Sequence, residues 1–145
     1  LPVGEVSREA AELMESTRQS LEEGIDASVA GNRIGDIGAA IQCLGQTRGY
    51  GVVREFVGHG VGRFLHEDPQ VPNYGEAGTG PLLRPGMCIA IEPMLNVGEP
   101  DVREKDDRWT VETSDGSLSA HFEHVVVITE NGTEVLTRGL DSKEG

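Results

Sequence analysis

The chain has 145 residues and a hydrophobic content of 37%, which suits one domain with a modest core. Its 25 acidic residues outnumber 12 basic ones, and the net charge of −13 argues against a surface that binds nucleic acid or anionic membranes. Cys43 and Cys88 form no CxxC motif and the longest apolar runs are too short to span a bilayer, so a reduced, cytoplasmic protein is expected.

Two helices are predicted in the first third of the chain. Residues 7–31 place apolar side chains at helical spacing, with Ser7 as a plausible N-cap and Gly31 as a stop signal. Residues 34–46 form a second apolar stripe that ends near Gly45 or Gly49. The stripe of this second helix consists of Ile34, Ile37, Ile41 and Leu44.

From Gly51 onward the pattern changes to short strands and turns. Residues 51–60 are rich in Val and Phe and predict a strand, whereas the prolines and glycines of residues 66–86 predict a loop. MCIAIEPM predicts a short strand buried on both faces, and Asp115-Gly116 predicts a hairpin between RWTVET and LSAHFEHVVVIT. A second turn, ENGT, leads into EVLT. Two helices followed by a largely antiparallel sheet indicate the α+β class.

Two glutamates interrupt strands that are otherwise apolar. Alternation places Glu92 on one face with Cys88 and Ala90, inside a strand that should be buried. A buried carboxylate needs a proton or a cation, and the alternative is an edge-strand residue that points into water. Glu123 poses the same problem just before the apolar run VVVI. Two carboxylates directed into one interior repel each other, and a divalent cation between them removes this repulsion.

Two histidines lie close together in GHGVGRFLHEDP. His59 is flanked by Gly58 and Gly60, which leave room for close backbone approach, and imidazole is a common metal ligand. One histidine and two glutamates suit Mn, Fe, Co or Zn. His66 could stand beside such a site as a hydrogen-bond donor, or be an ordinary polar loop residue. Each residue alone is more often structural, but their combination favours a metal site.

These segments, in this order, resemble the type I methionine aminopeptidases, peptidases with the pita-bread fold. The similarity runs from PVGEVS to VLT and is strongest in GHGVG…LHEDPQVPNYG, LRPGMCIAIEPM and WTVETSDGSLSAHFEHVVVIT. Prolidases and aminopeptidase P share the glycine-histidine and glutamate signals, whereas the IEPM and SAHFEH forms favour the methionine-specific branch. The resemblance implies that residues 1–145 form one domain, the C-terminal half of this fold, with two helices and a curved antiparallel sheet.

The resemblance also implies roles for individual residues. His59, Glu92 and Glu123 match metal ligands, Glu123 being the bridging one, and Glu92 matches a group that also carries a proton during turnover. His66 matches the histidine that contacts the scissile carbonyl of the substrate. An intact enzyme would hold two divalent ions, Co, Mn, Fe or Zn, and this chain alone is expected to hold one or none.

Two further matches concern the substrate pocket. Trp109 matches an aromatic residue beside the methionine side chain, and Leu65 stands where many relatives carry phenylalanine. The implied substrates are N-terminal methionyl peptides of nascent proteins. The resemblance also implies that the intact enzyme is a monomer and can associate with the ribosome. No direct contact with membrane or nucleic acid is expected.

Two aspartate ligands of the family have no counterpart in the chain. Asp26 and Asp36 fall in the helical region, where they are expected to be surface residues. The chain is therefore expected to be a C-terminal portion that is inactive as a peptidase and prone to self-association. Two alternatives are a non-catalytic binding module of the same fold and a proline-directed aminopeptidase similar to prolidase.

Overall fold

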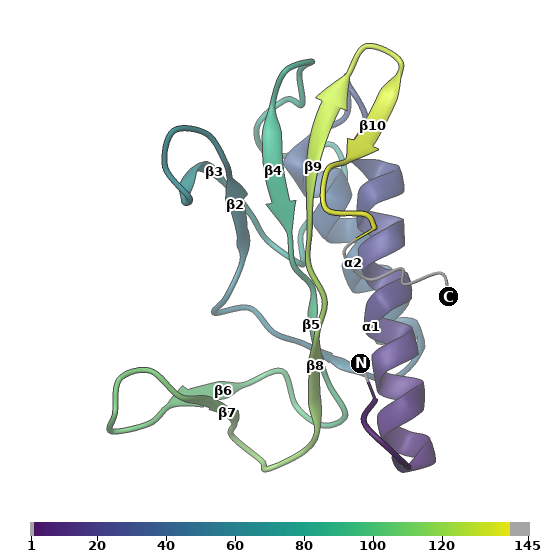
Figure 1. The fold of residues 1–145 in the computed structure, drawn as a ribbon, viewed down its shortest axis with the longest axis vertical. Helices are drawn as coiled ribbons and strands as arrows, with labels where there is room; N and C mark the ends of the chain where they lie inside the picture. Colours follow the sequence, from purple (N-terminus) through teal and green to yellow (C-terminus); the bar gives the residue numbers. More distant parts are fainter. Residues whose placement is uncertain (1, 140–145) are drawn as a thin grey trace.

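The computed structural model describes residues 2–139, which form two helices and three antiparallel sheets. Helix α1 spans Arg8–Ala27 and helix α2 spans Ile34–Thr47. Figure 1 shows both helices on one side of the strands, while the β2–β3 and β6–β7 hairpins project on the other side. The strands are β1 (Gly51–Val52), β2 (Gly58–Gly60), β3 (Glu67–Val71), β4 (Cys88–Ile91), β5 (Met94–Asn96), β6 (Val102–Glu104), β7 (Val111–Thr113), β8 (Ser119–His121), β9 (His124–Thr129) and β10 (Gly132–Val135). The expected α+β class is confirmed.

Both helices begin as the sequence predicts. The Ser7 hydroxyl oxygen accepts a hydrogen bond from the amide of Ala10 at 3.1 Å, which makes Ser7 the N-cap of α1. In α2, the Asp36 carboxylate accepts hydrogen bonds from the amides of Arg33 and Gly78, each at 2.7 Å, so it caps the start of the helix, a role that the expectation of a surface residue did not include. Helix α1 ends earlier than predicted. Its last residue is Ala27, and Gly31, with φ at 94°, belongs to the turn that leads into α2.

The strands form a five-stranded sheet, β10-β9-β4-β2-β3, and a three-stranded sheet, β1-β5-β8, beside the small β6–β7 hairpin. The two larger sheets share one register. Ile91 pairs with His124 at the end of the β4–β9 ladder, and Met94 pairs with His121 at the start of the β5–β8 ladder. The chain that forms β4 and β5 therefore stays aligned with the chain that forms β8 and β9. Between the two ladders lies a short gap, residues 92–93 opposite residues 122–123, in which the ladder pairing is interrupted.

The main core lies between the helices and one face of the five-stranded sheet. Alternate residues of β4 and β9 supply the sheet side of this core. The helices supply the other side through Leu21, Ile25, Ile37 and Ile41. The core residues of β4 and β9 are Ile89, Ile91, Val126 and Ile128, each 0% exposed. The opposite face of these strands carries Cys88, Ala90, Val125 and Val127, in line with Glu92 and Glu123.

Two predictions about strand boundaries are wrong. Residues 51–60 do not form one strand, because β1 and β2 belong to different sheets and are separated by five residues. Residues 66–86 are not all loop, because β3 lies within them. Strand β3 contains Pro69 but is the last strand in its sheet. A proline is tolerated at such an edge, where its missing N–H is not needed for a ladder.

The predicted hairpin at Asp115-Gly116 is also wrong, although a turn is present. Strand β7 pairs with β6 and β8 pairs with β5, so the segments on either side of the turn separate into different sheets. The Asp115 carboxylate explains the separation, because it accepts hydrogen bonds from the amides of Glu99 and Ser117, each at 2.9 Å. These bonds tie the turn to the loop after β5. The second predicted turn is confirmed by the pairing of Thr129 with Gly132 between β9 and β10.

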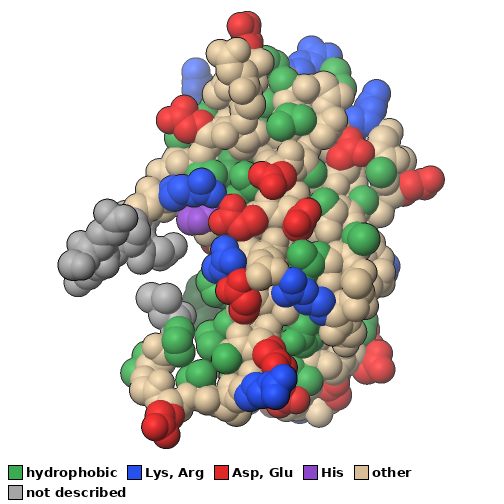
Figure 2. Space-filling model, turned by 90° about the vertical axis from the view of Figure 1, so that its right-hand side faces the viewer, with side chains coloured by type: hydrophobic (Ala, Val, Ile, Leu, Met, Phe, Trp, Pro, Cys, Tyr) green, Lys and Arg blue, Asp and Glu red, His purple; other side chains and the backbone are tan. Residues whose placement is uncertain are grey.

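The outer face of α1 accounts for part of the charge. Figure 2 shows acidic and basic side chains scattered over the helical face of the molecule. Arg8 pairs with Glu12 at 2.6 Å and Arg18 with Glu15 at 2.8 Å, spacings that place both pairs on one helix surface. This face is a mixed, solvated surface. Within the described part of the chain, no helix is both long and apolar enough to cross a membrane.

Candidate metal site

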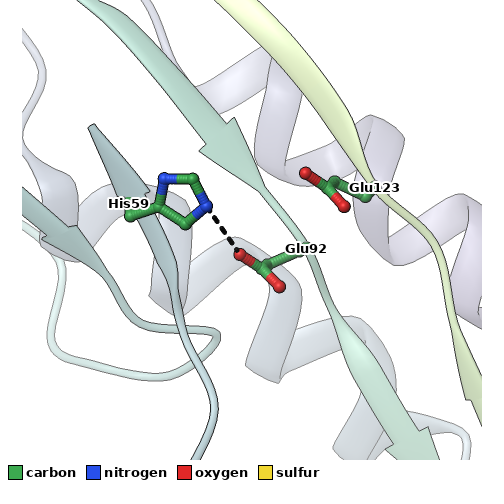
Figure 3. Close-up of side chains that lie close together, drawn as sticks. All are labelled: His59, Glu92 and Glu123. Atoms are coloured by element: carbon green, nitrogen blue, oxygen red, sulfur yellow. Dashed lines mark ion pairs between the residues drawn. The ribbon is translucent and has the colours of Figure 1, made fainter. Parts of the chain in front are cut away.

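Three side chains from separate segments converge on the sheet face opposite the helices. His59 lies in β2, Glu92 directly follows β4, and Glu123 directly precedes β9. Figure 3 shows Glu92 between the other two side chains. One ligand atom from each residue lies within 4.8 Å of the others. The convergence of imidazole and two carboxylates, expected from the sequence, is therefore present in the fold.

The two carboxylates face each other because of the strand register. Glu92 and Glu123 occupy the gap between the β4–β9 and β5–β8 ladders, where the shared register places them opposite each other. Like charges directly opposite on neighbouring strands destabilise a sheet. Burial raises the pKa of Glu92, the negative charge of Glu123 raises it further, and His59 acts in the opposite direction. The pair therefore favours a bound proton or cation.

His59 presents its ligand nitrogen toward Glu92. The ring nitrogen Nδ1 lies 2.9 Å from the backbone carbonyl oxygen of Gly60. A carbonyl oxygen only accepts hydrogen bonds, so Nδ1 carries the proton and donates. In the neutral ring the lone pair is then on Nε2, which lies 3.6 Å from Glu92 Oε1. This is the arrangement by which proteins orient a metal-binding imidazole.

The residues present fit a divalent metal ion. One imidazole nitrogen and carboxylate oxygens form a mixed donor set that suits Zn, Co, Mn or Fe. The side chains of His59 and Glu92 are only 14% and 13% exposed, so water screens their charges poorly. An ion between Glu92 and Glu123 would replace repulsion by attraction. The ligand set within residues 2–139 has three members.

Glu123 differs from its expected environment. Alternation along one continuous strand directs it toward the interior, but the residue is exposed. The expected strand is divided into β8 and β9, and Glu123 lies in the interruption. Its backbone is therefore not held in a ladder. Its carboxylate reaches the site from the solvent side, while Glu92 reaches it from a largely buried position.

The other predicted site residues lie around this cluster. His66 is exposed and its ring packs against that of His59, with 4.2 Å between ring centroids and a tilt of 56°. Leu65, beside it in the β2–β3 loop, is 71% exposed. Trp109 lies in the turn of the β6–β7 hairpin and is 87% exposed. The roles assigned to these three residues stay predictions.

His121 was not included among the predicted site residues. Its Nε2 lies 3.6 Å from Glu92 Oε2, while His59 approaches the other oxygen of the same carboxylate. The sequence contained a signal, since alternation places His121 on the same face as Glu123. His121 also lines a hollow of about 570 Å³ beside the cluster. The apolar part of the hollow's lining includes Val53, Phe56, Met94, Val102 and Val111.

Comparisons with known proteins agree with this geometry. The profile of metallopeptidase family M24 matches residues 1–130. The chain is 52% identical over 135 residues to the methionine aminopeptidase of Clostridium acetobutylicum, covering 93% of this chain and 54% of that protein. It superposes on a methionine aminopeptidase from Thermotoga maritima with a TM-score of 0.91 and 52% identity, over 93% of this chain and 54% of the other.

A prolidase from Pyrococcus furiosus is a more distant neighbour. It has a TM-score of 0.72 and 25% identity, over 95% of this chain and 35% of the prolidase. Together these structures confirm the expected pita-bread fold, and the identities favour the methionine aminopeptidase branch. The chain spans about half the length of the methionine aminopeptidases that it matches.

Proposed function

The chain belongs to metallopeptidase family M24, and we propose that it supplies part of the active site of a methionine aminopeptidase. The reaction is hydrolysis of the peptide bond after the N-terminal methionine of nascent proteins. The observation that carries the proposal is the convergence of His59, Glu92 and Glu123 within 4.8 Å of one another. The protein would act in the cytoplasm, as a monomer when intact.

In this proposal His59, Glu92 and Glu123 hold a divalent ion. When bound, such an ion supplies Lewis acidity toward the peptide carbonyl and activates water for hydrolysis. Glu92 is the residue that would move a proton: its carboxylate would accept the proton that the attacking water releases and then donate it to the nitrogen of the leaving amine. Its raised pKa, caused first by burial, favours a carboxyl group that can hold this proton for part of the cycle.

His66 is proposed to act on the substrate rather than on the metal. Its ring packs on the ring of His59, a contact beside the cluster that supports this role. It is also exposed, so a peptide can reach it. An N–H of His66 would donate a hydrogen bond to the scissile carbonyl oxygen as negative charge develops there. Leu65 and Trp109 would contact the methionine side chain of the substrate.

The hollow beside His121 supports a peptide substrate. Its lining is largely apolar, and His121 connects it to Glu92. A surface of this kind accepts an apolar segment of a peptide while the scissile bond lies at the cluster. The second substrate residue would lie near this junction. The acidic surface would disfavour direct binding of nucleic acid, and association with the ribosome is proposed for the intact enzyme.

We also propose that the 145-residue chain alone has no useful peptidase activity. The resemblance implies two aspartate ligands beyond the three side chains described above. Residues 1–145 would form one domain that completes a two-metal site only together with those aspartates. Three ligands can still hold a single ion, with lower affinity.

A chimaera provides the direct test. The chain would replace the matching part of the Thermotoga maritima enzyme, with which it shares 52% identity. We expect this chimaera, with Mn²⁺ or Co²⁺, to release methionine from a Met-Ala-Ser peptide and to leave Xaa-Pro peptides intact. The matched control is the Glu92→Gln chimaera, which should fold equally well and lose this activity.

The same chimaera separates the alternatives. A folded chimaera that binds no divalent ion would favour the non-catalytic binding module. Preferential cleavage of Xaa-Pro peptides would favour a prolidase-like enzyme. Robust turnover by the 145-residue chain alone would contradict the proposed inactivity without affecting the assignment of the cluster.

A further inference from the structure

We propose that Asn73 is a positioning residue that fixes the backbone of Glu92 and thereby aims the Glu92 carboxylate at His59 and Glu123. Asn73 lies two residues beyond the end of β3 and is 0% exposed. Its side-chain amide donates a hydrogen bond to the backbone carbonyl oxygen of Glu92 at 3.0 Å. This inference rests on the metal site proposed above.

The backbone of Glu92 needs such an anchor. Glu92 lies in the gap between two ladders, and the next residue, Pro93, has no N–H to donate. Strand β3, from which Asn73 follows, is not a neighbour of β4, because β2 lies between them in the sheet. The hydrogen bond from Asn73 to Glu92 therefore joins two segments that no ladder pairs directly. This hydrogen bond connects Glu92 with the segment after β3, and β3 is the strand paired with the one that carries His59.

Asn73 is itself held in place from the opposite side. Helix α2 packs against residues 72–74 at Gly38, where an added Cβ would lie only 2.3 Å from the Tyr74 carbonyl oxygen. The guanidinium of Arg54 lies 4.7 Å from the centre of the Tyr74 ring. Residues 72–74 therefore lie between α2 on one side and the gap that contains Glu92 on the other. A side chain fixed in this way can restrain Glu92 rather than follow its movements.

Asn73 is not an efficient stabiliser of the fold. Its Oδ1 is buried without a hydrogen-bond partner among the described residues, which is unfavourable. Asn96, at the far end of β5, has the same properties. It is 0% exposed, its Nδ2 donates to the Glu99 carbonyl oxygen at 2.9 Å, and its Oδ1 is also unpartnered within residues 2–139. Asn96 is therefore a matched control that differs in not touching Glu92.

The experiment compares Asn73→Leu, Asn96→Leu and Asn73→Gln in the 145-residue chain. Leucine keeps the branched shape of asparagine but removes the donor, whereas glutamine retains a side-chain amide N–H that can donate. Co²⁺ affinity is measured by calorimetry and Co²⁺ coordination by visible absorption, and urea unfolding reports stability. Asn73→Leu should weaken Co²⁺ binding by about 10–100-fold, the usual effect of losing a partner behind a ligand, and alter the visible spectrum.

Asn96→Leu should change stability to a similar extent and leave affinity and spectrum unchanged. Asn73→Gln should recover part of the affinity. Unchanged Co²⁺ binding in Asn73→Leu, or equal weakening in Asn96→Leu, would overturn the inference. If the unsubstituted chain binds no Co²⁺, the three side chains do not hold an ion without the two aspartates, and crystal structures of the metal-free variants then decide about Asn73. A Glu92 carboxylate displaced by more than about 0.5 Å in Asn73→Leu alone would support its positioning role, and an unmoved one would refute it.

Discussion

In the absence of metal, the Glu123→Gln variant should be more stable than the original chain. When metal is added, the variant should be the less stable of the two. The nearest ligand atoms of Glu92 and Glu123 lie within 4.8 Å. At that distance Coulomb's law gives about 3.5 kcal/mol of repulsion at an effective dielectric constant of about 20, and about 0.9 kcal/mol in bulk water. Glu123 is exposed, so the lower end applies, and a gain of about 1 kcal/mol is expected at pH 7.

The pH dependence has a definite sign. The folded-state pKa of Glu92 is raised, so its unfavourable contribution is absent in acid and appears as the pH rises. The advantage of Glu123→Gln should therefore be absent below about pH 4, near the unfolded-state pKa of glutamate, and grow toward neutral pH. Urea unfolding followed by circular dichroism measures this difference. Trp109 is 87% exposed, so its fluorescence would be a poor probe.

Metal should reverse the order of stability. An ion present at 100 times its dissociation constant stabilises the folded chain by about 2.7 kcal/mol, which exceeds the repulsion that the substitution removes. Glu130→Gln is the control, because Glu130 is an exposed glutamate in the β9–β10 turn, and it should change stability by less than about 0.5 kcal/mol under both conditions. A Glu123→Gln variant that is less stable than the original chain without metal would refute the reasoning. The reasoning would also be refuted if the variant stayed more stable than the original chain after metal is added.

Three further outcomes are expected. Gly38→Ala places a Cβ 2.3 Å from the Tyr74 carbonyl oxygen, so it should lower the free energy of unfolding by about 1–3 kcal/mol in a urea titration, and an unchanged midpoint would contradict the packing. His66→Ala should leave Co²⁺ affinity within a few-fold of the original in calorimetry while His59→Ala abolishes binding, and equal losses would place His66 among the ligands. The hydrogen bonds to Asp115 hold its pKa at about 2, so its carboxyl resonance should titrate near that pH in an NMR series, and a midpoint near 4 would show that these bonds are absent in solution.

The sequence predicted those features that depend on local patterns. Ser7 could be identified as an N-cap because capping is decided within one turn of helix. The helical stripes, the β9–β10 turn and the pairing of carboxylates with an imidazole follow from spacing and residue type. Glu92 could be identified because a charge within an apolar strand is costly unless it has a partner.

The remaining features depend on contacts between distant segments. Asp115 binds the amide of Glu99, and no local pattern shows that this contact separates β7 from β8. Pro69 is compatible with a strand only because β3 lies at a sheet edge. The shared register of two sheets places Glu92 opposite Glu123 in the gap between the ladders, and His121 reaches Glu92 at the same place. Asn73 was not singled out, because its importance lies entirely in a hydrogen bond across the fold.

The most direct test of the metal site is an X-ray diffraction experiment on crystals of this chain grown with Co²⁺ or Mn²⁺, with data collected at the absorption edge of the metal. An anomalous peak is predicted about 2.0–2.2 Å from His59 Nε2 and from a carboxylate oxygen of each of Glu92 and Glu123. A peak at other residues, or none at saturating metal with these side chains ordered, would contradict the account.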